Sequence, residues 1–177
     1  MVIFLQSELD LAIEKYCGDI NMRSAEHIGL KDRDMPKPDF IYRSANELDY
    51  QDVKKILEEI FELQISEGNY RAYLEDCTKC ILVAAAGATV GGCCCFEVVT
   101  NPLNNVKTCF IRYLGVLPEY RKYGIASGML GIVKEFARCS HIKPIELTCA
   151  DWRTDSHRFY KNNEFTIKKT KIFICEV

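Results

Sequence analysis

Two short stretches carry residues whose types and spacing suit chemistry, and the first is PEYRKYGIASGML at residues 118–130. It follows the apolar run TCFIRYLGVL and combines a cation, Arg121, with the small residues Gly124 and Ala126. A helix that begins near Gly124 leaves its first N–H groups without intrahelical partners, at the positive end of the helix dipole. Gly124 also removes a side chain where a ligand would approach the backbone. This corner is either an anion site suited to a pyrophosphate or a plain strand-to-helix turn.

The second stretch is HRFYKNNEF at residues 157–165, which places Phe159 and Tyr160 on a short helix entered from a strand. The usual glycine-rich phosphate loops are a poor match to the first stretch. A dinucleotide fingerprint needs three spaced glycines, and a P-loop needs Gly-Lys-Ser/Thr. Neither pattern is present in the sequence.

The strands and helices that must position these two stretches are predicted within residues 40–177. The patterns predict strands at 40–45, 80–86, 90–100, 107–117 and 145–150, and a long closing strand at 165–177. A helix is predicted to begin after Asn46, with an apolar face formed by Val53, Ile56, Leu57, Ile60 and Phe61. Further helices are predicted at 70–77, 124–139 and 154–163. Gly87-Ala88-Thr89 reads as a hairpin turn. This order implies a mixed α/β (α+β) domain at 40–177 whose sheet carries helices on its faces.

Residues 1–39 are predicted to form an N-terminal extension. Ser7 and Asp10 suggest a capping box before a helix, and a polar linker with two prolines follows. The helix is expected either to pack back on the domain or to serve an interface.

Composition narrows the classes of function. The chain has 177 residues and a formal charge of −2, which gives no general attraction for nucleic acid or an anionic membrane. Its ten cysteines lie mostly in apolar runs, and no secretory signal is apparent, so reduced thiols in the cytoplasm are expected. Cys77 and Cys80 have the spacing of half a zinc site, but no second pair follows, so no metal is expected. No run is long enough to span a membrane.

Together the two stretches carry a resemblance to a known family. RKYGIA resembles the Arg/Gln-x-x-Gly-x-Gly/Ala motif of the GCN5-related N-acetyltransferase (GNAT) superfamily, and HRFYKNNEF resembles its Phe-Tyr-x-x-x-Gly-Phe motif. The resemblance implies a mixed, mostly antiparallel sheet that splays between two parallel strands, here 107–116 and 144–150, where acetyl-CoA binds. The implied cofactor-binding residues are Leu114, Gly115, Val116, Arg121, Lys122, Tyr123, Gly124, Ile125, Ala126 and Ser127.

The implied chemistry is direct transfer of an acetyl group from a thioester to an amine. A backbone N–H, that of Val116, would meet the oxyanion. Tyr160 would protonate the departing thiolate as general acid, the alternative being a core aromatic residue. Many relatives carry a Glu, the general base, on the strand at 107–116, near the position of Arg112. Because Arg112 stands there in this chain, the identity of the general base is open. The candidates are Glu97, Asp151 and His157, for which the alternatives are a solvated strand edge, a turn carboxylate and a helix-surface histidine.

The acceptor is the least determined part. Arg112 either binds an acidic part of the acceptor or forms a surface salt bridge. ELTCADWRTDSHRFY resembles a subset that includes aminoalkylphosphonate acetyltransferases, with matches at Arg153, Ser156 and His157. We expect a small-molecule primary amine as acceptor, with a protein or peptide acceptor or a non-catalytic CoA-binding module as alternatives. Homodimers are common in the superfamily, so a homodimer is possible here.

One further departure concerns the helix at 154–163. Glu164 stands where the second motif has Gly, which commonly ends the helix with a positive φ. We expect Asn162 or Asn163 to take that conformation instead.

Overall fold

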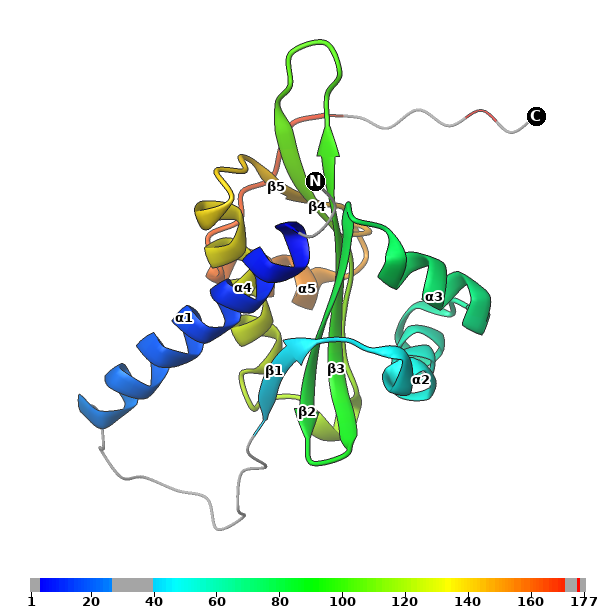
Figure 1. Cartoon of the computed structure of the whole chain (residues 1–177), viewed down its shortest axis with the longest axis vertical. Helices are drawn as coiled ribbons and strands as arrows, with labels where there is room; N and C mark the ends of the chain where they lie inside the picture. Colours follow the sequence, from blue (N-terminus) through cyan, green and yellow to red (C-terminus); the bar gives the residue numbers. More distant parts are fainter. Residues whose placement is uncertain (1–3, 27–39, 171–174, 176–177) are drawn as a thin grey trace. The chain divides into compact units, whose positions relative to one another are not determined.

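The computed structural model describes residues 4–26, 40–170 and 175. The chain divides into two compact units, Met1–Leu147 and Thr148–Val177, each described here by itself. The first unit holds α1 (Phe4–Glu26), β1 (Ile41–Ser44), η1 (Glu47–Asp49), α2 (Tyr50–Phe61), α3 (Glu67–Glu75), β2 (Lys79–Ala86), β3 (Thr89–Thr100), β4 (Lys107–Val116), η2 (Pro118–Tyr120), α4 (Ile125–Cys139) and β5 (Ile145–Leu147) (Figure 1). The second unit holds α5 (Thr154–Asn162). Among the helices of the described residues, none is both long and apolar enough to cross a membrane.

A five-stranded sheet in the order β1-β2-β3-β4-β5 organises the first unit. The pairs β1–β2, β2–β3 and β3–β4 are antiparallel, and β4–β5 is parallel. Ala86 pairs with Thr89 across the predicted hairpin, where Gly87 has a φ of 60° that favours glycine. The predicted mixed, mostly antiparallel sheet is confirmed.

Helices cover both faces of the sheet. Side chains alternate between its two sides along each strand, so both faces carry residues that pack against a helix. On one face, Val53, Ile56 and Leu57 of α2 pack with Val83 of β2 and Cys95 of β3. On the other face, Phe136 of α4 meets Phe96 of β3 with ring centroids 5.3 Å apart. Figure 1 shows α2 and α3 on one side of the strands, and α1 and α4 on the other. The predicted apolar face of α4 is confirmed, since Met129, Ile132, Val133 and Phe136 are all fully buried.

The helix α1 lies against α4 and runs antiparallel to it. Ser140 Oγ donates to Glu8 at 2.7 Å near one end, and Lys15 pairs with Glu135 at 2.9 Å toward the other. Leu9 and Ala12 are fully buried. The predicted capping box at Ser7 is wrong, because the helix already begins at Phe4 and Ser7 lies inside it. The division of the chain at residue 39 stays a prediction, and residues 27–39 lie outside the described part.

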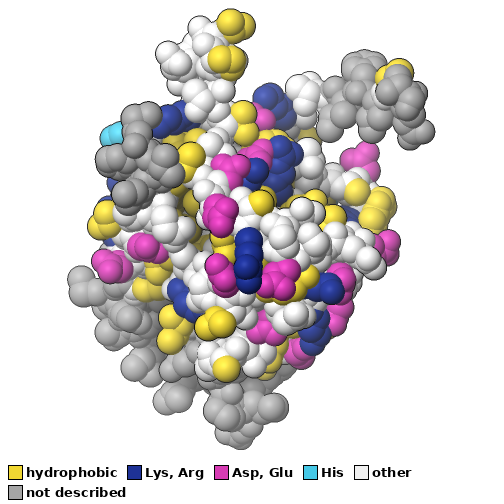
Figure 2. Space-filling view, turned by 45° about the vertical axis from the view of Figure 1, so that its right-hand side comes forward, with side chains coloured by type: hydrophobic (Ala, Val, Ile, Leu, Met, Phe, Trp, Pro, Cys, Tyr) yellow, Lys and Arg dark blue, Asp and Glu magenta, His cyan; other side chains and the backbone are white. Residues whose placement is uncertain are grey.

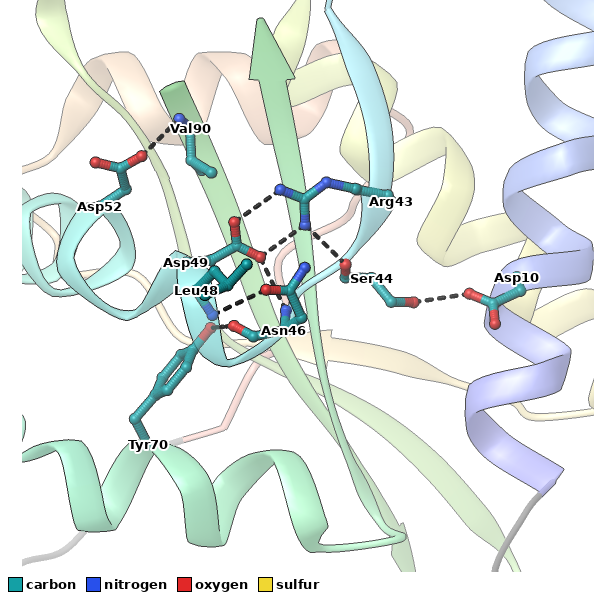
Figure 3. Close-up of polar contacts among 9 residues, drawn as sticks. All are labelled: Asp10, Arg43, Ser44, Asn46, Leu48, Asp49, Asp52, Tyr70 and Val90. Atoms are coloured by element: carbon teal, nitrogen blue, oxygen red, sulfur yellow. Dashed lines mark hydrogen bonds and ion pairs between the residues drawn. The ribbon is translucent and has the colours of Figure 1, made fainter. Parts of the chain in front are cut away.

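One buried carboxylate ties the start of α2 to β1, as Figure 3 shows. Arg43 donates to both oxygens of Asp49, at 2.6 and 2.7 Å. The same carboxylate accepts the Asn46 N–H at 2.8 Å, which completes the predicted Asn46–Asp49 capping box. Tyr70 of α3 donates to Asn46 O at 2.8 Å, so three elements meet at this corner. Burial raises the pKa of Asp49, but the bonds from Arg43 and Asn46 outweigh it, and the pKa lies below its ordinary value.

The last part of the chain departs from the predicted strands. β5 ends at Leu147 instead of residue 150, and Arg153 N–H donates to Ala150 O in a turn. Residues 165–170 form no strand, although one was predicted from 165 to 177. Residues 166–170 are exposed, and Thr170 N–H donates to Lys168 O, a bond within the segment that an extended strand does not make. The remainder of the predicted strand, at 171–174 and 176–177, lies outside the described residues.

Candidate functional site

The strand β4 parts from its parallel neighbour halfway along its length. Its pairing with β5 covers Cys109 with Ile145, Phe110 with Glu146 and Ile111 with Leu147. On its other edge, β4 stays paired with β3 as far as Val116 with Gly92. Within the described residues, the edge of β4 that β5 occupies is therefore left without a strand from residue 112 to 116.

A β-bulge stands at the point of separation. Phe96 pairs with Ile111 and Cys95 with Tyr113, so Arg112 is an extra residue on β4. A bulge bends its strand and increases the local twist. The bulge follows the last β5 pair directly, and it accounts for the divergence of the two parallel strands. No glycine or turn residue stands at this position to indicate the bulge, because Arg112 lies between Ile111 and Tyr113.

The loop after β4 is anchored to β3 by a second bulge. Ala84 pairs with Gly92 and Ala85 with Val90, so Gly91 is extra on β3. The Gly91 carbonyl accepts the Leu117 N–H at 2.9 Å. The ring of Tyr120 packs against Gly91 so closely that a Cβ at this residue would lie only 2.6 Å from Tyr120 Cδ2. Two adjacent glycines inside a strand were a usable signal for this bulge.

The helix α4 begins with an open N-terminus. Gly124 precedes it with a φ of 80°, and within the described part of the chain no side chain caps the start of the helix. A Cβ at Gly124 would meet nothing within 4 Å. The glycine is therefore required by its backbone conformation, and the space beside it is left open by the described protein atoms.

The predicted cofactor-binding residues occupy this strand, loop and helix start in one continuous run. Arg121, Lys122, Tyr123, Gly124 and Ser127 are exposed, whereas Gly115, Val116 and Ile125 are buried and Leu114 and Ala126 are half-buried. Gly115 has a packing role, because a Cβ there would come within 3.0 Å of Ile56, Ile60 and Phe61. The Arg121 side chain donates through Nε to Val116 O at 3.0 Å, which closes the loop back onto the end of β4.

Two of the candidate residues form an ion pair on β3 and β4. Arg112 donates to Glu97 Oε1 through Nε at 2.9 Å and also through Nη2. The guanidinium lies over the Phe110 ring, 4.4 Å from its centroid. Glu97 is the more shielded partner, with its side chain 15% exposed against 46% for Arg112. The salt-bridge alternative for Arg112 is thus present, and one oxygen of the Glu97 carboxylate accepts both bonds.

Tyr73 of α3 lies beside this ion pair and was not singled out from the sequence. Its hydroxyl donates to Phe96 O at 3.3 Å. Burial raises the pKa of Tyr73 far above its ordinary value, with Cys95 and then Glu97 adding to the shift. The phenol therefore stays protonated near Glu97 at neutral pH.

The remaining candidates lie in the second unit. Asp151 is exposed in the turn before α5, and the Arg153 guanidinium stacks 4.8 Å from the Trp152 ring centroid. His157 Nε2 lies 3.0 Å from Ala150 O. A carbonyl only accepts, so Nε2 must be the donor, and in the neutral ring Nδ1 keeps its lone pair.

Tyr160 is held by the end of α5. Its ring packs edge-on against Phe159 and Phe165, with centroids 5.3 and 5.8 Å apart. Phe165 N–H donates to Tyr160 O and Glu164 N–H to Lys161 O, at 3.0 and 3.1 Å. This is the Schellman arrangement, in which the two aromatic residues also make the accompanying apolar contact.

The residue in the left-handed conformation is Glu164, with a φ of 67°. The prediction that Asn162 or Asn163 adopts it is wrong. Asn163 has a φ of −101° and instead caps the helix through its side chain, which donates to Phe159 O at 2.9 Å. The position is therefore conformationally the same as the glycine of the resembled motif.

Comparisons with known proteins bear on the family and the fold of the chain. A model of the Acetyltransferase (GNAT) family matches residues 50–165. Among curated protein sequences, none matches the chain.

Several solved structures share the fold at low sequence identity. An aminoglycoside acetyltransferase from an uncultured soil metagenomic sample is 13% identical, with a TM-score of 0.69 over 78% of this chain and 95% of that one. A transcriptional regulator from Bacillus halodurans is 19% identical, with a TM-score of 0.70 over 78% and 100%. A ribosomal-protein-alanine N-acetyltransferase from Brucella melitensis biovar Abortus is 14% identical, with a TM-score of 0.66 over 77% and 99%.

Proposed function

The chain belongs to the GNAT family of acetyltransferases, and from that premise we propose that it transfers the acetyl group of acetyl-CoA to a primary amine. The observation that carries the proposal is the parting of β4 from β5 after Ile111, directly upstream of the open helix start at Gly124. Among the described residues, the part of β4 beyond this point has no strand on that edge, and the helix start that follows has no side-chain cap. These are the two kinds of backbone site that an extended amide-containing arm and a pyrophosphate require.

The residues present fit acetyl-CoA. The edge of β4 at residues 112–116 offers backbone groups to the amides of the pantetheine arm, and the N–H groups at the start of α4 suit the pyrophosphate. A Cβ at Gly124 would meet no described atom within 4 Å, so the approach to the helix start is open at this residue. Bound acetyl-CoA would supply an activated thioester, and the chain would supply binding, orientation and proton transfer.

We assign the general acid to Tyr160 and the oxyanion donor to the backbone N–H of Val116. A phenol has an ordinary pKa near 10 and is protonated at neutral pH, so it has a proton to give to a departing thiolate. The Schellman end of α5 and the rings of Phe159 and Phe165 restrict the motion of Tyr160. A backbone N–H is a preorganised donor that needs no reorientation during the reaction.

Among the three base candidates, the contacts favour His157. Its Nε2 bond to Ala150 O leaves Nδ1 as the acceptor, whereas Glu97 is paired with Arg112. His157 and Tyr160 are also three residues apart on α5 and therefore share one face of that helix. Asp151 is exposed in the turn before α5.

For the acceptor we propose a small-molecule amine. On the face seen in Figure 2, basic and acidic side chains are interspersed, and α2 and α3 carry ion pairs such as Lys54–Glu58, Lys55–Glu59 and Arg71–Glu67. This face offers no broad field of one sign to a charged peptide. Arg112 and Arg153 are the proposed contacts for an acidic group on the acceptor. A protein or peptide acceptor is the second candidate, and a homodimer stays a prediction.

Acetyl-CoA binding and turnover test the proposal in two steps. Acetyl-CoA should raise the melting temperature through linkage to binding, while adenosine, which lacks the pyrophosphate and the pantetheine arm, should not. Release of free thiol is then followed with a panel of small primary amines and with amine-bearing peptides. An absent shift at millimolar acetyl-CoA would reject the acetyltransferase proposal, and turnover only with peptides would move the acceptor to the second candidate.

A further inference from the structure

Two tyrosines fill glycine notches on α4. The glycines, Gly128 and Gly131, are three residues apart and therefore share one side of the helix. A Cβ at Gly128 would lie 2.1 Å from Tyr42 Oη, and a Cβ at Gly131 would lie 2.1 Å from Tyr16 Oη and Cζ. Real Cβ atoms do not make such contacts. The aromatic rings therefore approach the helix more closely than any other residue at these two positions would allow.

Both tyrosines come from segments that precede the matched family region, which begins at residue 50. Tyr42 is on β1 and Tyr16 is on α1. Tyr42 reaches the first residue of α4, with its hydroxyl 3.5 Å from Ile125 O, while Gly128 N–H donates to Gly124 O in the first turn. Burial, with smaller contributions from Tyr16 and Cys17, raises the pKa of Tyr42 to about 12, so its hydroxyl remains a donor at neutral pH.

Polar contacts made by residues 8–15 hold this part of α1 in place to present Tyr16. Lys15, next to Tyr16 in the chain, pairs with Glu135 at 2.9 Å. Asp10 accepts from Ser44 Oγ of β1 at 2.9 Å, as Figure 3 shows. With Leu9 fully buried, α1 is bound both to α4 and to the strand that carries Tyr42. The two tyrosines thus act on one helix from two elements that are themselves linked.

We propose that Tyr42 and Tyr16 are positioning residues that set the place of α4, and that α1 and β1 thereby control acetyl-CoA affinity. The inference rests on the proposed function, because it assumes that the start of α4 holds the pyrophosphate. Neither tyrosine needs to touch the ligand. Displacement of α4 moves its uncapped N–H groups relative to the end of β4, and both parts must be in register to bind one extended ligand.

Adding a methyl group at each glycine tests this inference with a clear sign. On helix propensity alone, Gly→Ala in a helix should raise the melting temperature by about 2–4 °C. Gly68→Ala in α3 is the matched control, because its Cβ would meet only Ser66 Oγ at 3.9 Å. We expect Gly68→Ala to show that gain with unchanged acetyl-CoA affinity. Gly128→Ala and Gly131→Ala should lose the gain and weaken acetyl-CoA binding by about tenfold in calorimetry.

Steady-state kinetics and rescue separate positioning from general damage. A positioning role predicts that the KM for acetyl-CoA rises while kcat at saturation stays within about twofold of the wild type. The double variant Gly131→Ala with Tyr16→Ala should recover part of the lost affinity, because the ring no longer collides with the new methyl group. Tyr42→Phe keeps the ring and removes only the hydroxyl, and it should raise the KM by a few-fold even if Gly128→Ala does not fold.

The outcomes distinguish this inference from the proposed function. If the wild type binds acetyl-CoA and the two α4 variants bind it equally well, the positioning role is overturned and the function stands. Equal losses of kcat and affinity without rescue would likewise overturn it, since they indicate a general loss of structure. If the wild type does not bind acetyl-CoA, the proposed function fails first, and this inference fails with it.

Discussion

At the scale of single residues, Tyr160 is the side chain on which the proposed chemistry most depends. Its ring is packed on both sides, so removal of the hydroxyl leaves the apolar contacts with Phe159 and Phe165 in place. We expect Tyr160→Phe to lower kcat by about 10²-fold, the usual contribution of one proton-transfer group, with little change in acetyl-CoA affinity. Rates of thiol release and calorimetric binding measure the two quantities separately. A variant with full kcat would remove Tyr160 from the mechanism.

The ion pair of Arg112 and Glu97 shows what single residues in a sequence do not reveal. The sequence identifies Glu97 as a base candidate and Arg112 as a contact for the acceptor. They lie 15 residues apart, and their positions in the chain do not indicate that they form a pair. Their contact depends on the register between β3 and β4, and that register shifts at Arg112 itself. Unlike the bulge at Gly91, the bulge at Arg112 is not marked by a glycine, so the pairing of these two side chains could not be predicted.

At the scale of elements, the start of α4 can be tested against a glycine of the same conformation. Gly124 and Gly87 have φ values of 80° and 60°, and a Cβ at either position would meet nothing within 4 Å. A tryptophan at either position carries a similar strain, about 1–2 kcal/mol for a left-handed residue. We expect both Gly124→Trp and Gly87→Trp to lower stability by that amount, and only Gly124→Trp to abolish acetyl-CoA binding. Equal affinity in the two variants would contradict the pyrophosphate assignment.

The end of α5 offers a prediction about stability alone. Glu164 holds a φ of 67°, which costs a non-glycine residue free energy in the folded state. We expect Glu164→Gly to raise the free energy of unfolding by about 0.5–1 kcal/mol, after the extra entropy of glycine in the unfolded chain is deducted. Glu164→Ala is the control, because it removes the side chain but keeps the strained backbone. Chemical denaturation measures both, and equal effects of the two substitutions would argue against relief of strain.

The same helix end shows how tertiary context overrides local preference. Asparagine tolerates the left-handed conformation better than glutamate, which made Asn162 and Asn163 the reasonable choices. The position is set instead by where the helix must stop for Phe165 to pack on Tyr160. The order of elements from residue 40 to 163 and the buried face of α4 were predictable, since they depend on periodicity and turn residues along the chain. The lengths of β5 and of the predicted last strand could not be predicted, because they depend on pairing with neighbouring strands.

At the scale of the whole molecule, stability should be greatest across a plateau near neutral pH. Among the described residues, three carboxyl groups have lowered pKa values. Hydrogen bonds from Arg138 lower the pKa of Glu135 to about 2. Hydrogen bonds from Lys79 and Thr78 lower the pKa of Asp76 to about 2 as well. Asp49 is lowered by Arg43 and Asn46 against its burial. Such groups stabilise the fold above their ordinary pKa values, and that stability is lost as the pH falls from about 4.5 toward 2.

Buried thiols limit the plateau on the alkaline side. Burial raises the pKa values of Cys80 and Cys109 from 9.0 to about 12, so the unfolded chain ionises first. Their contribution is complete below about pH 9 and is lost as the pH rises toward 12. Urea denaturation midpoints across pH should therefore fall on both sides of the plateau. Asp49→Asn should lose about 1.5–3 kcal/mol at neutral pH, because Arg43 loses its ionic partner but stays partly exposed and bonded to Ser44 O, and should show a shallower acid decline. An unchanged acid decline would rule out Asp49 as a contributor.

The short parallel ladder between β4 and β5 has a consequence for the motions of the sheet. Only three residue pairs join these strands, whereas β4 is paired with β3 along nearly its whole length. Regions with few backbone bonds open at low free energy, without unfolding of the remainder. The amides of β5 should therefore exchange with deuterium long before those of β3. The strand bordering the proposed cofactor edge is thus the one that the sheet releases most readily.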